Sequence, residues 1–327
     1  MTLVRFTLGA CLLGFLIAPP LRAQESAPAT NSQGAAIFSL ASQTAQSGSI
    51  SAAAATLTNE AARYLLPGLG SDMPDWAKRI EFDAGVDQHA KPSYSILTVQ
   101  PLFQSENKQD TLFIQGSQLR YDLFGEYRDT TNLGLGYRRL FFDNSLMIGA
   151  NSFYDYEWTN RHQRYSIGGE VKYAMLDLYS NRYLAVTDIK DVGDNNKERV
   201  LEGYDIELRS QLPFMPWGRI GAKRYVWETK NSTNIQGWTV SADADIAQNL
   251  VLEGGISDDN VNDRDAFAKL TFRLAMTDRP VLLSSDFFET TPFRMRDMRS
   301  YTLDKVRRQN KILVEREARG VVIARGN

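Results

Sequence analysis

Histidine is the side chain that first suggests chemistry in this sequence, because imidazole ligates metals and acts as a general base. The 327-residue chain has only two, His89 and His162. Neither has a second histidine at the H-x-x-x-H spacing, and a zinc site needs three or four clustered ligands. A Ser-His-Asp hydrolase would need a serine such as Ser166 beside His162, but the alternation described below turns Ser166 away from the lipid face. We therefore expect two polar loop or turn residues, no metal, no cofactor and no enzyme.

Glycine and cysteine chemistry is also weakly indicated. Gly134, Gly136 and the pair 168–169 lie inside predicted strands with no helix after them, so a phosphate loop is not indicated. Close strand packing, or room for a threaded segment, explains them better. The single cysteine, Cys11, lies in a segment that we expect to be removed on export, which leaves no thiol or disulfide chemistry. A net charge of −2 gives no reason to expect nucleic acid as a partner.

Charged residues that alternate with apolar ones are the functional candidates that we favour. Glu207 and Arg209, for example, alternate with Ile206 and Leu208, so the two sets face opposite sides of a sheet. Ionisable groups at membrane depth are costly unless they line water or pair with one another. We expect a set of such residues to face a barrel lumen and to hold a basic segment there, although any barrel lumen is polar. The set is Arg138, Glu170, Lys172, Glu207, Arg209, Asp243, Asp245, Lys269 and Arg273.

The basic segment is residues 299–315, in which basic and apolar side chains are interleaved. Its basic residues are Arg299, Lys305, Arg307, Arg308 and Lys311. We expect it to pass through the pore as part of a post-barrel region, 277–327, that also contains an irregular stretch and a short C-terminal tail.

The element that must position these residues is an antiparallel sheet with unlike faces. From residue 79 onward apolar residues recur with period two, in segments of about ten residues, the length of a tilted membrane strand. Tyrosine and tryptophan crowd strand ends, as at 153–158 and 225–227, which is typical of interfacial girdles. The sequence thus predicts an all-β transmembrane antiparallel barrel of about twelve strands over 74–276. A soluble β-sandwich is the structural alternative.

Turn signals divide this region into strands and loops. We place the strands at 79–87, 94–104, 111–121, 128–141, 144–157, 164–175, 176–187, 200–212, 217–228, 236–247, 249–257 and 265–275. Tight turns such as 143–144 would face the periplasm. Polar stretches would be the outer loops, at 159–163, 188–198, 229–234 and 258–263.

The N-terminus predicts export. Arg5, the apolar run 6–18 and Ala23 form a secretory signal over 1–23. Residues 24–73 are rich in Ala and Ser and predict a periplasmic leader with two short helices within 35–66. No later segment has the ~18 consecutive apolar residues of a membrane helix, which excludes a helical membrane protein.

Several motifs resemble the β-domain of the intimin/invasin family, the inverse autotransporters. The most distinctive block is Asn-Leu-Gly-Leu-Gly-Tyr-Arg at 132–138, followed by Ile-Gly-Ala-Asn-Ser-Phe-Tyr-Asp-Tyr at 148–156 and by 162–171. Pro-Asp-Trp-Ala at 74–77 resembles the start of the family's barrel, and 301–315, with Val-Arg-Arg-Gln-Asn-Lys-Ile at its centre, resembles the family's linker.

The resemblance implies a twelve-stranded outer-membrane barrel with a periplasmic N-terminus and a linker that runs through the pore to the cell surface. It also implies lipid, the barrel-assembly machinery and periplasmic chaperones as partners. The family normally continues into adhesive passenger domains, threaded as a hairpin, and we expect these to be lacking because only 318–327 follow. No LysM-type module is visible upstream. A partner adhesin and a surface target are left open, and the alternative is a porin-like or stand-alone outer-membrane barrel with no export role.

Overall fold

The computed structural model describes residues 74–283, 288–318 and 321–324. The predicted signal peptide, leader and short helices lie outside these residues. Among the residues that are described, no helix is long and apolar enough to cross a membrane.

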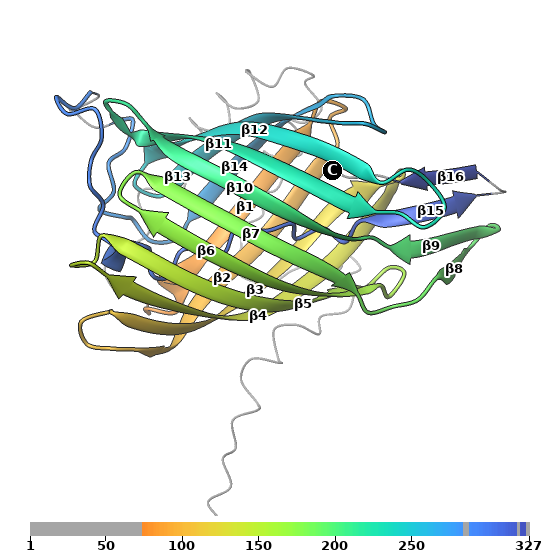
Figure 1. Ribbon diagram of the computed structural model, residues 1–327, viewed down its shortest axis with the longest axis horizontal. Helices are drawn as coiled ribbons and strands as arrows, with labels where there is room; N and C mark the ends of the chain where they lie inside the picture. Colours follow the sequence, from red (N-terminus) through yellow and green to blue (C-terminus); the bar gives the residue numbers. More distant parts are fainter. Residues whose placement is uncertain (1–73, 284–287, 319–320, 325–327) are drawn as a thin grey trace, which may run out of the picture.

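Twelve strands in the described part of the chain form a closed antiparallel barrel (Figure 1), as the period-two pattern predicted. Neighbours follow chain order, except that β7 pairs with β10, and β1 closes the barrel against β14 with Phe82 opposite Phe272. The strands are β1 (Ile80–Asp87), β2 (Pro92–Gln104), β3 (Asp110–Leu123), β4 (Glu126–Phe141), β5 (Leu146–Glu157), β6 (Gln163–Tyr173), β7 (Leu176–Ala185), β10 (Glu202–Leu212), β11 (Met215–Glu228), β12 (Ile235–Ala247), β13 (Leu250–Asp259) and β14 (Asp265–Arg273).

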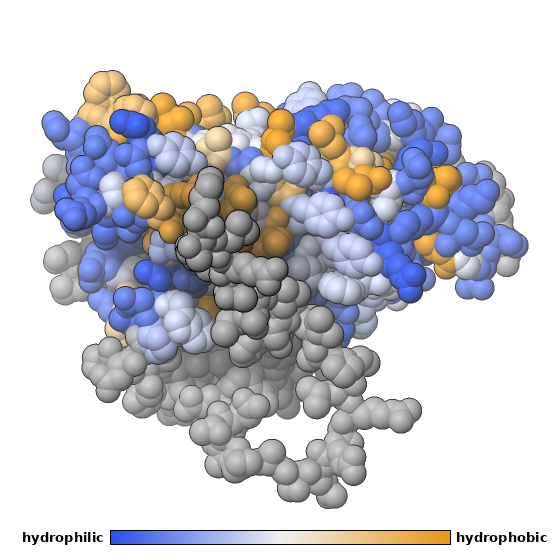
Figure 2. Space-filling model, turned by 90° about the horizontal axis from the view of Figure 1, so that it is seen from below, coloured by the Kyte–Doolittle hydropathy of each residue, from blue (hydrophilic) through white to orange (hydrophobic). Residues whose placement is uncertain are grey.

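The two faces of the wall differ as the alternation requires. On β4, Leu133 and Leu135 are about half exposed on the outside, whereas Asn132 and Arg138 point inward and are buried. Successive side chains of a strand lie on opposite faces, so the outer wall is apolar and the lumen polar. Figure 2 shows hydrophobic residues along the wall and a mostly hydrophilic projecting end.

The two ends of the barrel also differ. At one end, here the turn end, strands are joined by short turns such as 142–145 and 213–214. Ala77–Arg79 forms a short 3-10 helix, η2, just before β1 begins there. At the opposite end, here the hairpin end, the chain between β7 and β10 projects beyond the barrel (Figure 1). Aromatic side chains are exposed at both ends, Phe142 and Phe214 at the first, Tyr127 and Trp158 at the second.

The polar stretch 188–198, predicted as a simple loop, contains two short strands. These are β8 (Lys190–Gly193) and β9 (Asn196–Val200). They join β15 (Val314–Ala318) and β16 (Val321–Ala324) in a four-stranded sheet of order β16-β15-β9-β8. Strand β9 is polar because this sheet extends beyond the barrel wall. Its polar composition resembles that of a loop, and the sequence pattern therefore did not indicate a strand here.

The chain after β14 follows the rim of the turn end before it turns inward. We call the described residues on either side of 284–287, namely 276–283 and 288–297, the rim strap. Its backbone bonds to Asp245 and Ile246 at the end of β12, and then to Phe214 in the β10–β11 turn. After the strap, the short 3-10 helix η3 (Met298–Tyr301) bonds to Asn144 in the β4–β5 turn. The strap therefore crosses half of the rim and delivers the chain to the mouth of the lumen.

Candidate functional site: the occupied lumen

Residues 302–313 run through the lumen from the turn end to the hairpin end, and we call them the lumen segment. Its backbone belongs to no sheet, with a turn at 302–303 and bends at 308 and 311. From residue 305 to residue 308, successive side chains contact opposite walls of the barrel. The wall of β2–β7 is here the packed half, and the wall of β10–β14 with β1 is the open half.

Two basic side chains of the lumen segment face the open half. The Lys305 ammonium lies 2.9 Å from Glu81 and 3.3 Å from Asp83, both on β1. The Arg307 guanidinium lies 3.1 Å from Glu207 on β10 and 2.7 Å from Glu253 on β13. Each cation thus meets two carboxylates, which offsets the cost of removing its charge from bulk water.

The residues between and after them face the packed half. Val306 donates its backbone N–H to the Gln115 side chain at 2.8 Å, and its side chain packs in an apolar cluster with Phe113 and Phe153. Arg308 is fully buried, and its guanidinium lies 2.6 Å from Asp155 on β5. The same carboxylate accepts from Arg164 at 2.9 Å, so one buried anion holds two cations.

Wall side chains also bond the backbone of the lumen segment. Arg138 donates to the carbonyls of residues 302 and 304, at 2.8 and 2.7 Å. Arg164 donates to the carbonyls of residues 309 and 311, at 2.6 and 2.9 Å. A buried carbonyl without a hydrogen-bond partner is costly. The lumen segment is not paired with a neighbouring strand, so the two arginines donate to these carbonyls instead.

The chain leaves the lumen at the hairpin end and enters the projecting sheet. Tyr121 donates to the Ile312 carbonyl at 3.2 Å, and the Leu201 amide donates to the Leu313 carbonyl at 2.9 Å. Val314 then pairs with Val200, which begins the β15–β9 ladder. The lumen segment is therefore continuous with a strand outside the barrel.

A buried charge cluster joins this tail to the barrel. Glu198 on β9 meets Arg316 on β15 at 2.6 Å and Arg128 on β4 at 2.7 Å, and the His162 Nε2 lies 2.9 Å from it. Burial raises the pKa of the Glu198 carboxyl, but hydrogen bonds with His162 and Arg128 outweigh burial and hold this pKa well below its usual range. Glu198 is therefore a charged anchor for the tail.

The predicted lumen residues all lie on the inner wall, in different relations to the lumen segment. Arg138, Lys172 and Glu207 contact it directly, Lys172 through Asp304 at 3.6 Å. Glu170 and Arg209 contact it indirectly, because Glu170 pairs with Arg138 and Arg209 pairs with Glu207, and both of those partners contact the lumen segment. The other four form ion pairs with wall residues: Asp243 with Arg209, Asp245 with Arg273, Lys269 with Glu253, and Arg273 also with Glu81.

The basic residues predicted for the linker are also placed differently from one another. Lys305, Arg307 and Arg308 lie inside the lumen with the partners given above, and Lys311 lies over the Tyr121 ring at 5.6 Å. Arg299 lies at the mouth, half exposed, and pairs at 2.5 Å with its own neighbour Asp297.

Sequence reasoning missed several of the strongest contacts. Asp155 and Arg164 lie inside the block that resembles the known family, and their alternation with exposed Tyr154 and Tyr165 would have turned them inward. Glu198 gave no such signal, because it falls in a stretch that resembles a polar loop.

The predicted strand glycines make room for aromatic rings of the wall. A Cβ on Gly134 would lie 2.3 Å from the Phe153 ring, and one on Gly136 would lie 2.2 Å from the Phe113 ring. Both rings pack against Val306 of the lumen segment. The glycines thus allow the two rings to pack where they contact the lumen segment.

A cavity of about 540 Å³ remains inside the turn end, mainly along the open half. Its lining includes Asp243, Asp245, Arg273 and, from the rim strap, Arg279. Side chains there keep some exposure, 16% for Asp245 and 18% for Arg273. The lumen segment thus fills the packed half and leaves space beside the open half.

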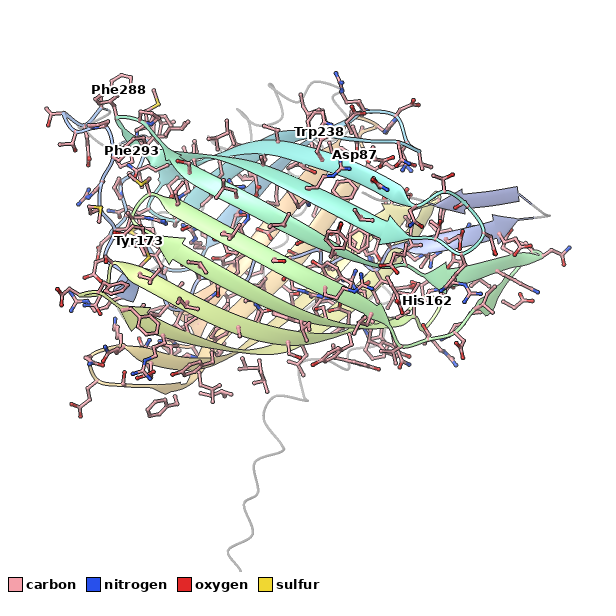
Figure 3. The ribbon with its side chains drawn as sticks, in the orientation of Figure 1. Asp87, His162, Tyr173, Trp238, Phe288 and Phe293 are labelled. Carbon is pink, nitrogen blue, oxygen red and sulfur yellow. The ribbon has the colours of Figure 1, made fainter. Side chains whose placement is uncertain are left out.

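The hydrolase hypothesis is not supported by the geometry of its residues. His162 is fully buried at the hairpin end (Figure 3), against Glu198. Ser166 faces the lumen, and its hydroxyl accepts from Arg308 at 3.0 Å. Within the described residues, no cluster of three or more His, Cys, Asp or Glu side chains could hold a metal.

Comparison with known proteins gives a consistent result. A family model described as "Inverse autotransporter, beta-domain" matches residues 28–310. The "Putative attaching and effacing protein homolog" of Escherichia coli (strain K12) is 27% identical over 176 residues, 50% of this chain and 56% of that protein. The "Inverse autotransporter adhesin YeeJ" of the same strain is 31% identical over 158 residues, 46% of this chain and 6% of that protein.

The chain therefore spans about half the length of the first of these relatives and a small part of the second. Neither name describes an enzyme. One solved structure, described as "Unveiling the Mechanism Behind the in-meso Crystallization of Membrane Proteins", aligns with a TM-score of 0.60 and 21% identity. The alignment covers 73% of this chain and all of the other, which supports the barrel fold.

Proposed function

The chain belongs to the inverse autotransporter β-domain family, and from this premise we propose that it is an outer-membrane translocator barrel that holds its own C-terminal segment at the cell surface. The fold and the family place the protein in the bacterial outer membrane. The turn end faces the periplasm in this proposal, and the hairpin end faces the outside. Outer-membrane lipid surrounds the wall, and the barrel-assembly machinery and periplasmic chaperones act transiently during insertion.

One observation carries the proposal: wall side chains bond the lumen segment along its whole length, and the segment then continues into β15 beyond the barrel. A polar pore alone does not need this. Elsewhere in the barrel a neighbouring strand supplies hydrogen-bond partners to backbone carbonyls. Arg138 and Arg164 supply them to the lumen segment, because a buried backbone at membrane depth needs such partners. The function that we infer is structural and related to adhesion, in line with the names of the relatives.

Surface labelling tests the proposal. A peptide tag is added after Asn327, and intact cells are probed with an antibody and a protease, with a periplasmic protein as the leakage control. We expect the tag to be reached without breaking the outer membrane. A tag that is reached only in broken cells would place the tail in the periplasm and overturn the proposed export role.

Conductance separates the proposal from a porin-like function. The purified barrel in a planar bilayer should conduct poorly, because the lumen segment and its partners occupy the packed half. A variant that lacks residues 299–327 should conduct more. Large, steady currents from the unaltered protein would favour the porin-like alternative.

A further inference from the structure

The rim strap has unlike sides. Two of its arginines turn toward the barrel interior and are largely buried: Arg279 pairs with Asp304 of the lumen segment, and Arg296 pairs at 2.5 Å with Asp177 of β7. The exposed residues of the strap include Arg294, which pairs with Glu289 at 3.2 Å, and four large apolar side chains. These four are Leu283, at 73% exposure, Phe288 at 59%, Phe293 at 38% and Met295 at 60%. Clusters of exposed apolar side chains mark an interaction surface.

The position of the strap indicates what covers this surface. The outer wall is apolar, and its turn end carries exposed aromatic or apolar groups: Phe142 in the β4–β5 turn, Tyr173 at the end of β6 and Phe214 in the β10–β11 turn. Aromatic side chains at such a position lie at the boundary between lipid and water. The β12–β13 turn, residues 248–249, has none, since its sequence is Gln-Asn.

The strap passes this sector. Its Leu283 amide bonds to Ile246 at the end of β12, and its Glu289 amide bonds to Phe214. Figure 3 shows Phe288 and Phe293 at the same end as Tyr173, with Phe288 on the outer side of the barrel. The exposed apolar side chains of the strap thus lie at the same end of the barrel as the exposed aromatic side chains of the wall.

We propose that the rim strap is an interfacial membrane anchor, whose Leu283, Phe288, Phe293 and Met295 insert into the phospholipid leaflet around the turn end. The proposal rests on the membrane placement under "Proposed function". The strap then holds the start of the lumen segment through the Arg279–Asp304 pair, and is itself fixed to the barrel by Arg296 and to the lipid by its apolar side chains. Insertion of Phe288 and Phe293 into the lipid removes apolar surface from water, which stabilises the attachment of the strap at the rim.

Site-directed spin labelling tests this. The full chain with Cys11→Ser carries one nitroxide at a time, at Phe288→Cys or Phe293→Cys, and is reconstituted in vesicles of phosphatidylethanolamine and phosphatidylglycerol. Collision rates with oxygen, which concentrates in lipid, and with a water-soluble nickel chelate are measured. Ile148→Cys on the outer wall is the lipid reference, and Asn107→Cys, exposed in the β2–β3 turn, is the water reference.

We expect the oxygen-to-nickel ratio at both strap positions to be several-fold higher than at residue 107 and close to that at residue 148. Ratios like that of residue 107, while residue 148 reads as lipid, would overturn the anchor and leave the barrel placement intact. If residue 148 also reads as water, the membrane placement itself fails. Heat-dependent gel migration of each labelled variant shows that the barrel has folded, and two independent strap positions guard against a local defect at either one.

Discussion

The two halves of the lumen accommodate charged side chains differently. In the packed half, Asp155, Arg164 and Arg308 are fully buried and share one carboxylate between two guanidinium groups. In the open half, Asp245 and Arg273 pair beside a cavity and keep part of their exposure. Buried charges depend entirely on their partners, whereas partly hydrated ones do not. The difference teaches that similar alternating charges can either hold the threaded segment or merely line space beside it.

Matched neutralisations give the largest expected contrast. Asp155→Asn leaves Arg164 and Arg308 buried without their carboxylate, and should cost about 3–5 kcal/mol of unfolding free energy. Asp245→Asn leaves Arg273 with Glu81 at 3.3 Å, and should cost less than about 1 kcal/mol. Urea unfolding in lipid vesicles, followed by heat-dependent gel migration, measures both. Equal losses would mean that the two halves do not differ in this way.

Glycine substitutions sharpen the comparison through packing rather than charge. Gly136→Ala places a Cβ 2.2 Å from the buried Phe113 ring, and should destabilise the barrel by about 1–3 kcal/mol. Gly254→Ala on β13 meets nothing closer than a carbonyl oxygen at 3.6 Å, and should be neutral or slightly stabilising, since glycine loses more backbone entropy on folding. The same unfolding assay applies, and a loss for the second variant as large as for the first would remove the packing argument.

Acidity should loosen the tail outside the barrel. The pKa of the Glu198 carboxyl is lowered in the folded chain from an ordinary value of 4.5, so its contribution is complete above that value and is lost as pH falls toward the folded pKa. Hydrogen exchange at β15, followed by mass spectrometry, should therefore be constant from neutral pH down to about 5 and accelerate below it, after correction for intrinsic rates.

Glu198→Gln is the matched control for this pH dependence. It removes the titrating group, so exchange at β15 should already be faster at neutral pH and show a flatter profile. An unaltered profile in this variant would assign the acid effect to another group.

The smallest effect is expected at Arg299. It is exposed at the mouth and pairs only with Asp297, and such pairs are worth little. Arg299→Ala should leave the unfolding midpoint unchanged, whereas Arg308→Ala should lower it clearly because Asp155 then keeps one cation instead of two. A clear loss at Arg299 would show that the mouth contributes to the hold on the segment.

Alternation in the sequence was sufficient to predict which side chains of the barrel wall face outward and which face the lumen. It did not predict the contacts of the lumen segment. Period two assigns Leu133 to the outside and Arg138 to the lumen because neighbouring residues on one strand settle that question. The partners of the lumen segment depend on contacts between distant parts of the chain, such as Arg307 with Glu207. Strand β9 was hidden for the same reason: its ladder partner is β15, far away in sequence, and its polar residues resemble a loop.

The alternation of residues 305–308 between the two walls also constrains the position of the chain along the lumen. Lys305 and Arg307 meet carboxylates on one side, while Val306 meets an apolar cluster on the other. A slide by a single residue would exchange these sides, turning a cation to the apolar cluster and leaving carboxylates without partners. These contacts are therefore satisfied together in one register only. That register determines which residue leaves the barrel at the hairpin end, and so the length of chain beyond it.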